Sequence, residues 1–185
     1  SEALEIGRKI GEKIIIIGSS TGGTLAAVGA SEKNVSGIIL VSPNFKTRYR
    51  FFHILTLGYA RFWVPLIIGK YRNVNAQSKE HAKYWTTYYP TVAIITMAAL
   101  VKKVVGLNYS QQISPALFIL SEQDEVVDAK KSLQIAKQWG GKSSTHLVNC
   151  GPHDDPNSHT IVGDIKSPTQ TKQLVETSLA WIKSL

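Results

Sequence analysis

The amino-acid sequence predicts an α/β fold built on a mostly parallel sheet. An all-apolar, β-branched run at residues 13–17 ends at a glycine-framed turn and is followed by small and apolar residues that favour a helix. Three further strands are expected, at Gly37–Val41, Pro115–Leu120 and Thr145–Asn149, and the first two of these are apolar runs. The length of 185 residues and the 43% apolar fraction are ordinary for one globular core.

The helices and strands are expected in the following order. Residues 3–10 look like the end of a helix, the first strand follows at residues 13–17, and a helix starts directly after Ser20. The second strand is Gly37–Val41, and a long insertion separates it from the third strand at Pro115–Leu120. A helix then opens near Ala129, the fourth strand follows, and a last helix covers residues 168–184.

The turn after the first strand carries the sequence Gly18-Ser19-Ser20-Thr21-Gly22, which fits the pattern G-x-S-x-G. A serine at the centre of such a tight turn is strained, and we expect glycines two positions away to let strand and helix pass closely. In residues and context this stretch resembles the nucleophile elbow of the α/β-hydrolase family, in particular its carboxylesterase and lipase branches. The resemblance covers nearly the whole chain and implies that Ser20 is a nucleophile.

The resemblance also implies an acid after a later strand. The strand Pro115–Leu120 ends in Ser-Glu-Gln-Asp-Glu-Val-Val-Asp, and the family's acid occupies the position that Asp124 holds, two residues before the Val-Val pair. Asp124 is therefore the expected triad acid, with Glu122 and Asp128 as alternatives. Asp128 is also better placed than Asp124 to cap the helix that opens near Ala129.

Two histidines follow the last strand and compete for the role of base. His159 lies in a stretch that resembles the family's catalytic histidine region, in which small apolar residues, a polar loop and the last helix follow. His153 is flanked by Pro152 and two aspartates and looks like a turn residue, so His159 is favoured. The other histidines, His53, His81 and His146, are expected to be satisfied or solvent-facing.

The oxyanion of an acyl-transfer reaction needs two hydrogen-bond donors. The first is expected to be the backbone N–H of Thr21, at the N-terminus of the helix that follows the serine. In the family the second comes from a loop after an earlier strand, and only about a dozen residues precede the first strand here. Since the chain also begins with serine, we expect a C-terminal portion of a larger hydrolase, with the N-terminal strands and second donor in the missing part.

Residues 44–110 are expected to form a helical cap inserted into a core made of residues 1–43 and 111–185. Helical apolar spacing connects Phe51, Phe52, Leu55, Tyr59, Phe62 and Trp63, and Pro65 and Pro90 are expected to separate three or four helices. The insertion holds 13 of the 16 aromatic residues of the chain, which is either a wall for an apolar substrate or, for most of the rings, the filling of the cap's own core.

The positive charge of the chain is concentrated in the same segment. Residues 44–110 contain ten basic residues and one acid, Glu80, so they account for +9, while the rest of the chain carries −1. Basic and aromatic residues together on a helical surface suit a peripheral contact with anionic lipid, and a solvated helix face is the alternative. No nucleic-acid partner is expected, because no helix-turn-helix, zinc-finger or RNA-binding signature accompanies the charge.

The sequence predicts no cofactor and no metal. The spacing of Gly18, Gly22 and Gly23 does not meet the dinucleotide pattern G-x-G-x-x-G, and His153-Asp154-Asp155 is interpreted as a loop. Cys150 is the only cysteine, so an internal disulfide is excluded, and a cytoplasmic location is expected unless the missing part holds a signal peptide.

Taken together, these observations predict a serine hydrolase that cleaves small-molecule or lipid esters through Ser20, His159 and Asp124. A thioesterase or acyltransferase with the same triad is the alternative, and a non-catalytic binding module of the same fold is another.

Overall fold

The structure, a computed structural model, describes residues 2–185. Four strands form one parallel sheet in the order β1-β2-β5-β6. They are β1 (Ile14–Ser19), β2 (Val35–Val41), β5 (Ala116–Leu120) and β6 (Ser143–Leu147). The predicted α/β fold with a parallel sheet is confirmed, and the predicted strand ends differ from the observed ones by at most two residues.

Both ends of strand β6 differ from the predicted ends by two residues. It begins at Ser143, opposite Ala116 of β5, and ends at Leu147, whereas the sequence predicted Thr145–Asn149. β6 lies at the edge of the sheet, where its first residues are only partly buried. The polar start of this strand therefore carries no apolar signal, although its backbone pairs with β5.

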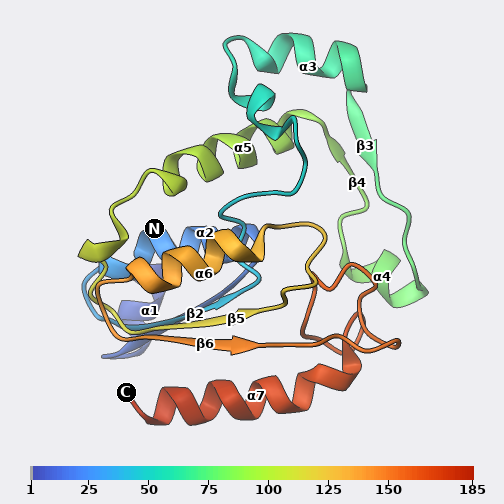
Figure 1. Cartoon of the computed structure of the whole chain (residues 1–185). Helices are drawn as coiled ribbons and strands as arrows, with labels where there is room; N and C mark the ends of the chain where they lie inside the picture. The colour runs from blue at the N-terminus through green and yellow to red at the C-terminus, as the bar shows by residue number, and fades with distance from the viewer. Residues whose placement is uncertain (1) are drawn as a thin grey trace.

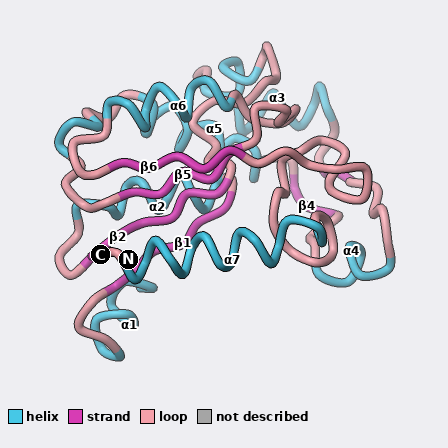
Figure 2. The backbone as a smooth tube through the Cα atoms, turned by 60° about the horizontal axis from the view of Figure 1, so that its bottom comes forward, coloured by secondary structure: helices cyan, strands magenta, loops and turns pink. Residues whose placement is uncertain are grey.

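Helices cover both faces of the sheet (Figures 1 and 2). α2 (Thr21–Val28), α5 (Val92–Val105) and α6 (Ala129–Gln138) lie over one face, and α7 (Pro168–Lys183) runs along the other. α1 (Glu2–Ile10) contacts the edge strand β1. Two short 3-10 helices, η1 (Gly29–Ser31) and η3 (Tyr109–Gln111), complete the core.

Alternate residues of the central strands fill the two layers of the core. Ile38, Leu40 and Phe118 pack in a cluster with residues of α2, α5 and α6. Ile39 and Leu117, one position away, pack in the other cluster with residues of α7. Because side chains of a strand alternate between faces, a strand buried on both sides needs an unbroken apolar run, and this is the signal that identified β2 and β5 in the sequence.

The insertion, residues 44–110, contains more than helices. It comprises η2 (Phe52–Thr56), α3 (Ala60–Ile68), β3 (Tyr71–Asn73), α4 (Lys79–Tyr84), β4 (Tyr88–Pro90) and α5. Helix α5 takes up most of the last third of the insertion. The antiparallel ribbon β3-β4 was not predicted. Its register pairs Tyr71 with Pro90 and Asn73 with Tyr88, and the rings of Tyr71 and Tyr88 stack with centroids 4.9 Å apart. Such a pairing has no local signature in a three-residue strand.

Two details of the predicted insertion are wrong. The apolar spacing from Phe51 to Trp63 does not form one helix, because Tyr59 adopts a left-handed conformation with φ 59° and separates η2 from α3. Pro65 lies inside α3 and not between helices. The division into core and insertion remains a prediction, and Phe45 and Tyr109, near the ends of the insertion, pack in the main core.

Candidate active site

Ser20 occupies the sharp turn between β1 and α2. Its backbone has φ 51° and ψ −120°, a region that residues other than glycine rarely adopt. Hydrogen bonds hold the turn in place: Ser20 N–H donates to the carbonyl of Val41, and the Ser20 carbonyl accepts from the N–H groups of Thr24 and Asn44. Hydrogen bonds to the adjacent strand end and to the first turn of α2 thus stabilise the strained backbone conformation of Ser20.

The glycines around Ser20 differ from the prediction in one respect. A Cβ atom at Gly18 would lie 2.4 Å from the carbonyl oxygen of Gly22, and one at Gly23 would lie 2.9 Å from Pro43 Cβ. A Cβ atom at Gly22, by contrast, would meet nothing within 4 Å. The close passage of strand and helix therefore requires Gly18 and Gly23, whereas Gly22 contributes only its backbone to the crowding.

Asp124 lies in the turn after β5 and is 1% exposed. Its Oδ1 atom accepts hydrogen bonds of 2.8 Å from the N–H groups of Val126 and Val127, which fix the orientation of the carboxylate. The two alternatives for the acid lie elsewhere: Glu122 is exposed, and Asp128 accepts from Lys130 N–H as the N-cap of α6. The predicted capping role of Asp128 is confirmed.

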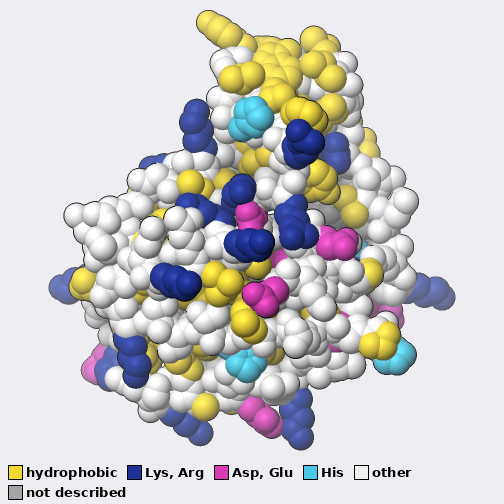
Figure 3. All heavy atoms as spheres, in the orientation of Figure 1, with side chains coloured by type: hydrophobic (Ala, Val, Ile, Leu, Met, Phe, Trp, Pro, Cys, Tyr) yellow, Lys and Arg dark blue, Asp and Glu magenta, His cyan; other side chains and the backbone are white. Residues whose placement is uncertain are grey.

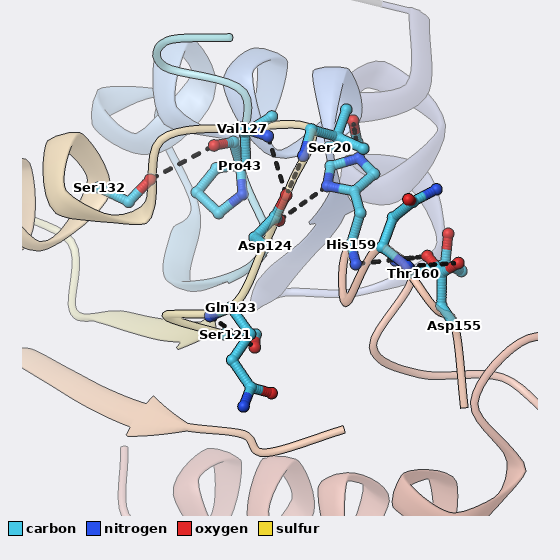
Figure 4. Close-up of polar contacts among 12 residues, drawn as sticks. Ser20, Pro43, Ser121, Gln123, Asp124, Val127, Ser132, Asp155, His159 and Thr160 are labelled. Atoms are coloured by element: carbon cyan, nitrogen blue, oxygen red, sulfur yellow. Dashed lines mark hydrogen bonds and ion pairs between the residues drawn. The ribbon is translucent and has the colours of Figure 1, made fainter. Parts of the chain in front are cut away.

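The structure brings Ser20, His159 and Asp124 together in one hydrogen-bonded chain (Figure 4). His159 Nδ1 lies 2.8 Å from Asp124 Oδ2, and His159 Nε2 lies 2.9 Å from Ser20 Oγ. Since an ionised carboxylate can only accept, Nδ1 carries the proton, and Nε2 is left to accept the hydroxyl proton of the serine. The arrangement can therefore transfer a proton from Ser20 to an imidazole whose orientation is fixed.

Asp155, which the sequence pattern assigned to a loop, holds the segment that carries His159. Its Oδ2 atom accepts from the N–H groups of His159 (3.3 Å) and Thr160 (2.8 Å), and its Oδ1 atom forms a 3.1 Å ion pair with Lys166 Nζ. Burial raises the pKa of the Asp155 carboxyl, but the Thr160 N–H and the Lys166 ammonium outweigh it and hold the pKa below its usual value.

Asp154 connects the same loop to α7 through hydrogen bonds. Its carboxylate accepts from Gly151 N–H (2.8 Å), from both the N–H and the hydroxyl of Thr169, and from the Gln170 side chain. Burial raises the pKa of this carboxyl as well, and these hydrogen bonds bring it below the usual value. The sequence could not show this role of Asp154, because the groups that its carboxylate contacts are backbone N–H groups or side chains distant in the sequence. Its only sign in the sequence was the Asp-Asp pair that follows His153.

Thr21 is the first residue of α2, so its N–H has no partner within the helix and lies directly after the serine. Its role as oxyanion donor remains a prediction, as does the second donor. Beside the turn, Ser42 Oγ and Asn44 Oδ1 are buried and have no hydrogen-bond partner within residues 2–185.

Within residues 2–185, His159 is the histidine that hydrogen-bonds to Ser20. His153 is exposed in a turn and His53 is exposed in η2. His81 is buried, accepts from Gln77 N–H and packs edge-on against Trp85, and His146 lies in β6. Across residues 2–185, no group of three or more His, Cys, Asp or Glu side chains is placed to hold a metal ion.

Most of the aromatic residues of the insertion do not fill its core, so that alternative is wrong, and the wall for an apolar substrate remains a prediction. Eight of the 13 rings are exposed: Tyr49, Phe51, Tyr59, Phe62, Tyr71, Tyr84, Trp85 and Tyr88. The small core of the insertion is largely aliphatic, with Ala60, Val64 and Ile95 at its centre and Trp63 packed against it. A surface of this kind could not be foreseen, because apolar spacing is the same whether a residue faces a core or solvent.

Comparison with known proteins identifies the family of this chain. The profile of the Hydrolase_4 family, described as serine aminopeptidase S33, matches residues 3–154. A search among curated proteins finds no matching sequence. No helix within residues 2–185 is both long enough and apolar enough to cross a bilayer.

Several solved structures share the fold at low sequence identity. A structure reported with the metagenome-derived lipolytic enzymes LipS and LipT matches with a TM-score of 0.72 and 16% identity over 100% of this chain and 70% of that chain. A soluble variant of monoglyceride lipase from Saccharomyces cerevisiae matches with a TM-score of 0.65 and 13% identity over 99% of this chain and 66% of that chain. Mouse α/β hydrolase domain-containing protein 10 matches with a TM-score of 0.60 and 17% identity over 99% and 67%. The chain therefore has the α/β-hydrolase fold and spans about two thirds of the length of these structures.

Proposed function

Because the chain belongs to the serine aminopeptidase S33 (Hydrolase_4) family, we propose that it is a serine hydrolase that cleaves carboxylic esters. The observation that carries the proposal is the unbroken contact from Ser20 Oγ through the His159 ring to the buried Asp124 carboxylate. Three such groups, contributed by segments up to 139 positions apart in the chain, meet at hydrogen-bond distance. This is the arrangement that a weak hydroxyl nucleophile needs at neutral pH.

In the first half of the reaction, Ser20 Oγ attacks the carbonyl carbon of the ester while His159 Nε2 accepts the hydroxyl proton. Asp124 stabilises the imidazolium that forms and keeps Nδ1 protonated. The negative charge on the carbonyl oxygen is stabilised by the Thr21 N–H at the start of α2, where the helix dipole also favours an anion. His159 then donates its proton to the departing alcohol, which leaves an acyl group on Ser20.

In the second half, water replaces the alcohol. His159 Nε2 accepts a proton from this water as its oxygen attacks the acyl carbon, and the same proton returns to Ser20 Oγ when the carboxylic acid is released. The serine and imidazole are thus regenerated, and no cofactor takes part in the proposed cycle.

An ester is favoured over a peptide with a free amino terminus by the charge of the insertion. A peptidase that acts on amino termini must stabilise a substrate ammonium group, whereas residues 44–110 hold ten basic residues and the single acid Glu80. Like charges repel, so this segment favours neutral or anionic substrates. Small-molecule and lipid esters fit that requirement, and the lipolytic enzymes compared above share the fold.

A fluorophosphonate probe tests the proposal directly, because it labels only an activated serine. We expect labelling of Ser20 in the wild-type protein and none in Ser20→Ala. Hydrolysis of p-nitrophenyl esters should accompany labelling and should exceed that of amino-acid p-nitroanilides. The absence of labelling in folded protein would favour a binding module, and faster turnover of a matched thioester would favour a thioesterase.

A further inference from the structure

Helix α3 presents apolar side chains on its outward face. Ala60 and Val64 point inward and pack against Ile95, whereas Phe62 and Leu66, one helical turn apart on the other side, are 74% and 80% exposed. A helix on the surface of a globular protein carries polar residues at such positions, and a helix that is apolar all round is matched to apolar surroundings. The outward face of α3 is therefore built for contact with an apolar phase or partner.

The neighbouring residues extend this face into a continuous patch. We define the α3 patch as five exposed residues: Leu57, Tyr59, Phe62, Leu66 and Ile67. The rings of Tyr59 and Phe62 lie 6.5 Å apart. Figure 3 shows hydrophobic side chains gathered over α3 at one end of the molecule, with Lys and Arg side chains below them. Singly exposed apolar residues are common, but a grouping of this size marks an interaction site.

Basic residues adjoin the α3 patch directly. Arg61, Lys102 and Lys103 line a groove of about 780 Å³ together with Leu57, Tyr59 and Phe62. None of these three cations takes part in an ion pair within residues 2–185. The only acid of the insertion, Glu80, lies on α4, at the opposite end of the β3-β4 ribbon from α3 (Figure 1). The charges next to the patch are thus free to contact an external anion.

We propose that the α3 patch docks on the surface of a lipid bilayer that contains anionic lipids. The apolar side chains enter the boundary between headgroups and acyl chains, and Arg61, Lys102 and Lys103 contact the lipid phosphates. The charge pattern selects this partner. The apolar centre of the surface matches the acyl region of a bilayer, and its purely cationic rim matches the anionic headgroups. A second copy of this chain would bring the same cations against each other.

Vesicle flotation of the whole chain tests the proposal without measuring catalysis. We expect binding to vesicles of phosphatidylcholine mixed with phosphatidylglycerol, and much weaker binding to phosphatidylcholine alone. Raising the salt from about 0.1 M to about 1 M shortens the Debye length from about 10 Å to about 3 Å and should release the protein.

Two sets of variants separate the apolar and the cationic contributions. Phe62→Ser with Leu66→Ser should weaken binding at least tenfold. Replacing Arg61, Lys102 and Lys103 by Gln should weaken it about a hundredfold, since each basic residue near an anionic surface contributes about a factor of five. The controls make equal changes outside the patch, at Ile10 and Ile113 to Ser and at Lys130, Lys137 and Lys142 to Gln, all exposed in the wild type. Circular dichroism confirms that each variant is folded.

Several results would overturn the proposal. The proposal is wrong if the wild-type protein does not float with anionic vesicles. It is also wrong if the protein binds neutral vesicles equally well, or if the control variants lose as much binding as the patch variants. A dimer in solution that Phe62→Ser with Leu66→Ser converts to a monomer, with no vesicle binding by either, would assign the patch to a second copy instead.

Discussion

Asp155 and Lys166 form a buried ion pair, 3.1 Å between Oδ1 and Nζ, with side chains that are 3% and 9% exposed. The other oxygen of the same carboxylate accepts from the backbone of His159 and Thr160. Lys166 also contacts Gln77 of the insertion. One buried pair therefore joins the histidine loop to the segment that precedes α7 and to the insertion.

Asp155→Asn should be strongly destabilising, because it leaves the Lys166 ammonium buried without its counter-charge. Removing one partner of a buried pair costs about 3–5 kcal/mol, and urea unfolding measures the loss. Asp128→Asn is the matched control, since it removes an exposed pair with Lys46 while asparagine still caps α6. We expect a loss of at most about 1 kcal/mol there. Similar losses in both variants would contradict the role given to Asp155.

Stability should fall in acid partly through Asp154 and Asp155. The pKa of each carboxyl is below its reference value of 3.8 in the folded protein, so the unfolded chain binds protons more readily. The stabilisation is complete above the unfolded pKa and is lost as the pH falls from about 4 through the lower folded pKa values. Urea midpoints across this range measure the effect. The double variant Asp154→Asn with Asp155→Asn should be less stable at neutral pH and should show a shallower decline in acid.

His159→Ala should lower kcat/KM for a p-nitrophenyl ester by a factor on the order of 10³ or more, since no other base within residues 2–185 contacts Ser20 Oγ. His153→Ala should change it little, because His153 is exposed in a turn. Equal effects, or a larger effect for His153, would mean that the base has been assigned to the wrong histidine.

Gly18→Ala and Gly22→Ala should differ sharply, although both glycines belong to the same motif. The new methyl at position 18 would lie 2.4 Å from a backbone oxygen, and we expect a loss of about 3 kcal/mol or more or a failure to fold. At position 22 the methyl meets open space within α2, where alanine is favoured over glycine by about 1 kcal/mol. Thermal or urea unfolding distinguishes the two cases, and a severe loss in Gly22→Ala would show that our account of the turn is incomplete.

The sequence by itself determined the elements with strong local signals. The unbroken apolar runs of β2 and β5 predicted buried strands, because such strands are covered on both faces. The strand, the glycine-framed serine and the small residues after it predicted the turn at Ser20. Asp124 and His159 were expected from the resemblance to the α/β-hydrolase family, and the structure places His159 at hydrogen-bond distance from both Asp124 and Ser20.

The tertiary structure alone decided the features that depend on partners distant in the sequence. Asp155 acquires its role from Lys166 and from backbone groups that only the folded loop brings near. Gly23 is required because Pro43, 20 positions away, packs against it. Phe62 and Val64 are both apolar residues of α3, yet one faces solvent and the other the core. Apolar periodicity records the chemistry of a side chain, whereas its exposure is set by which other elements pack against its helix.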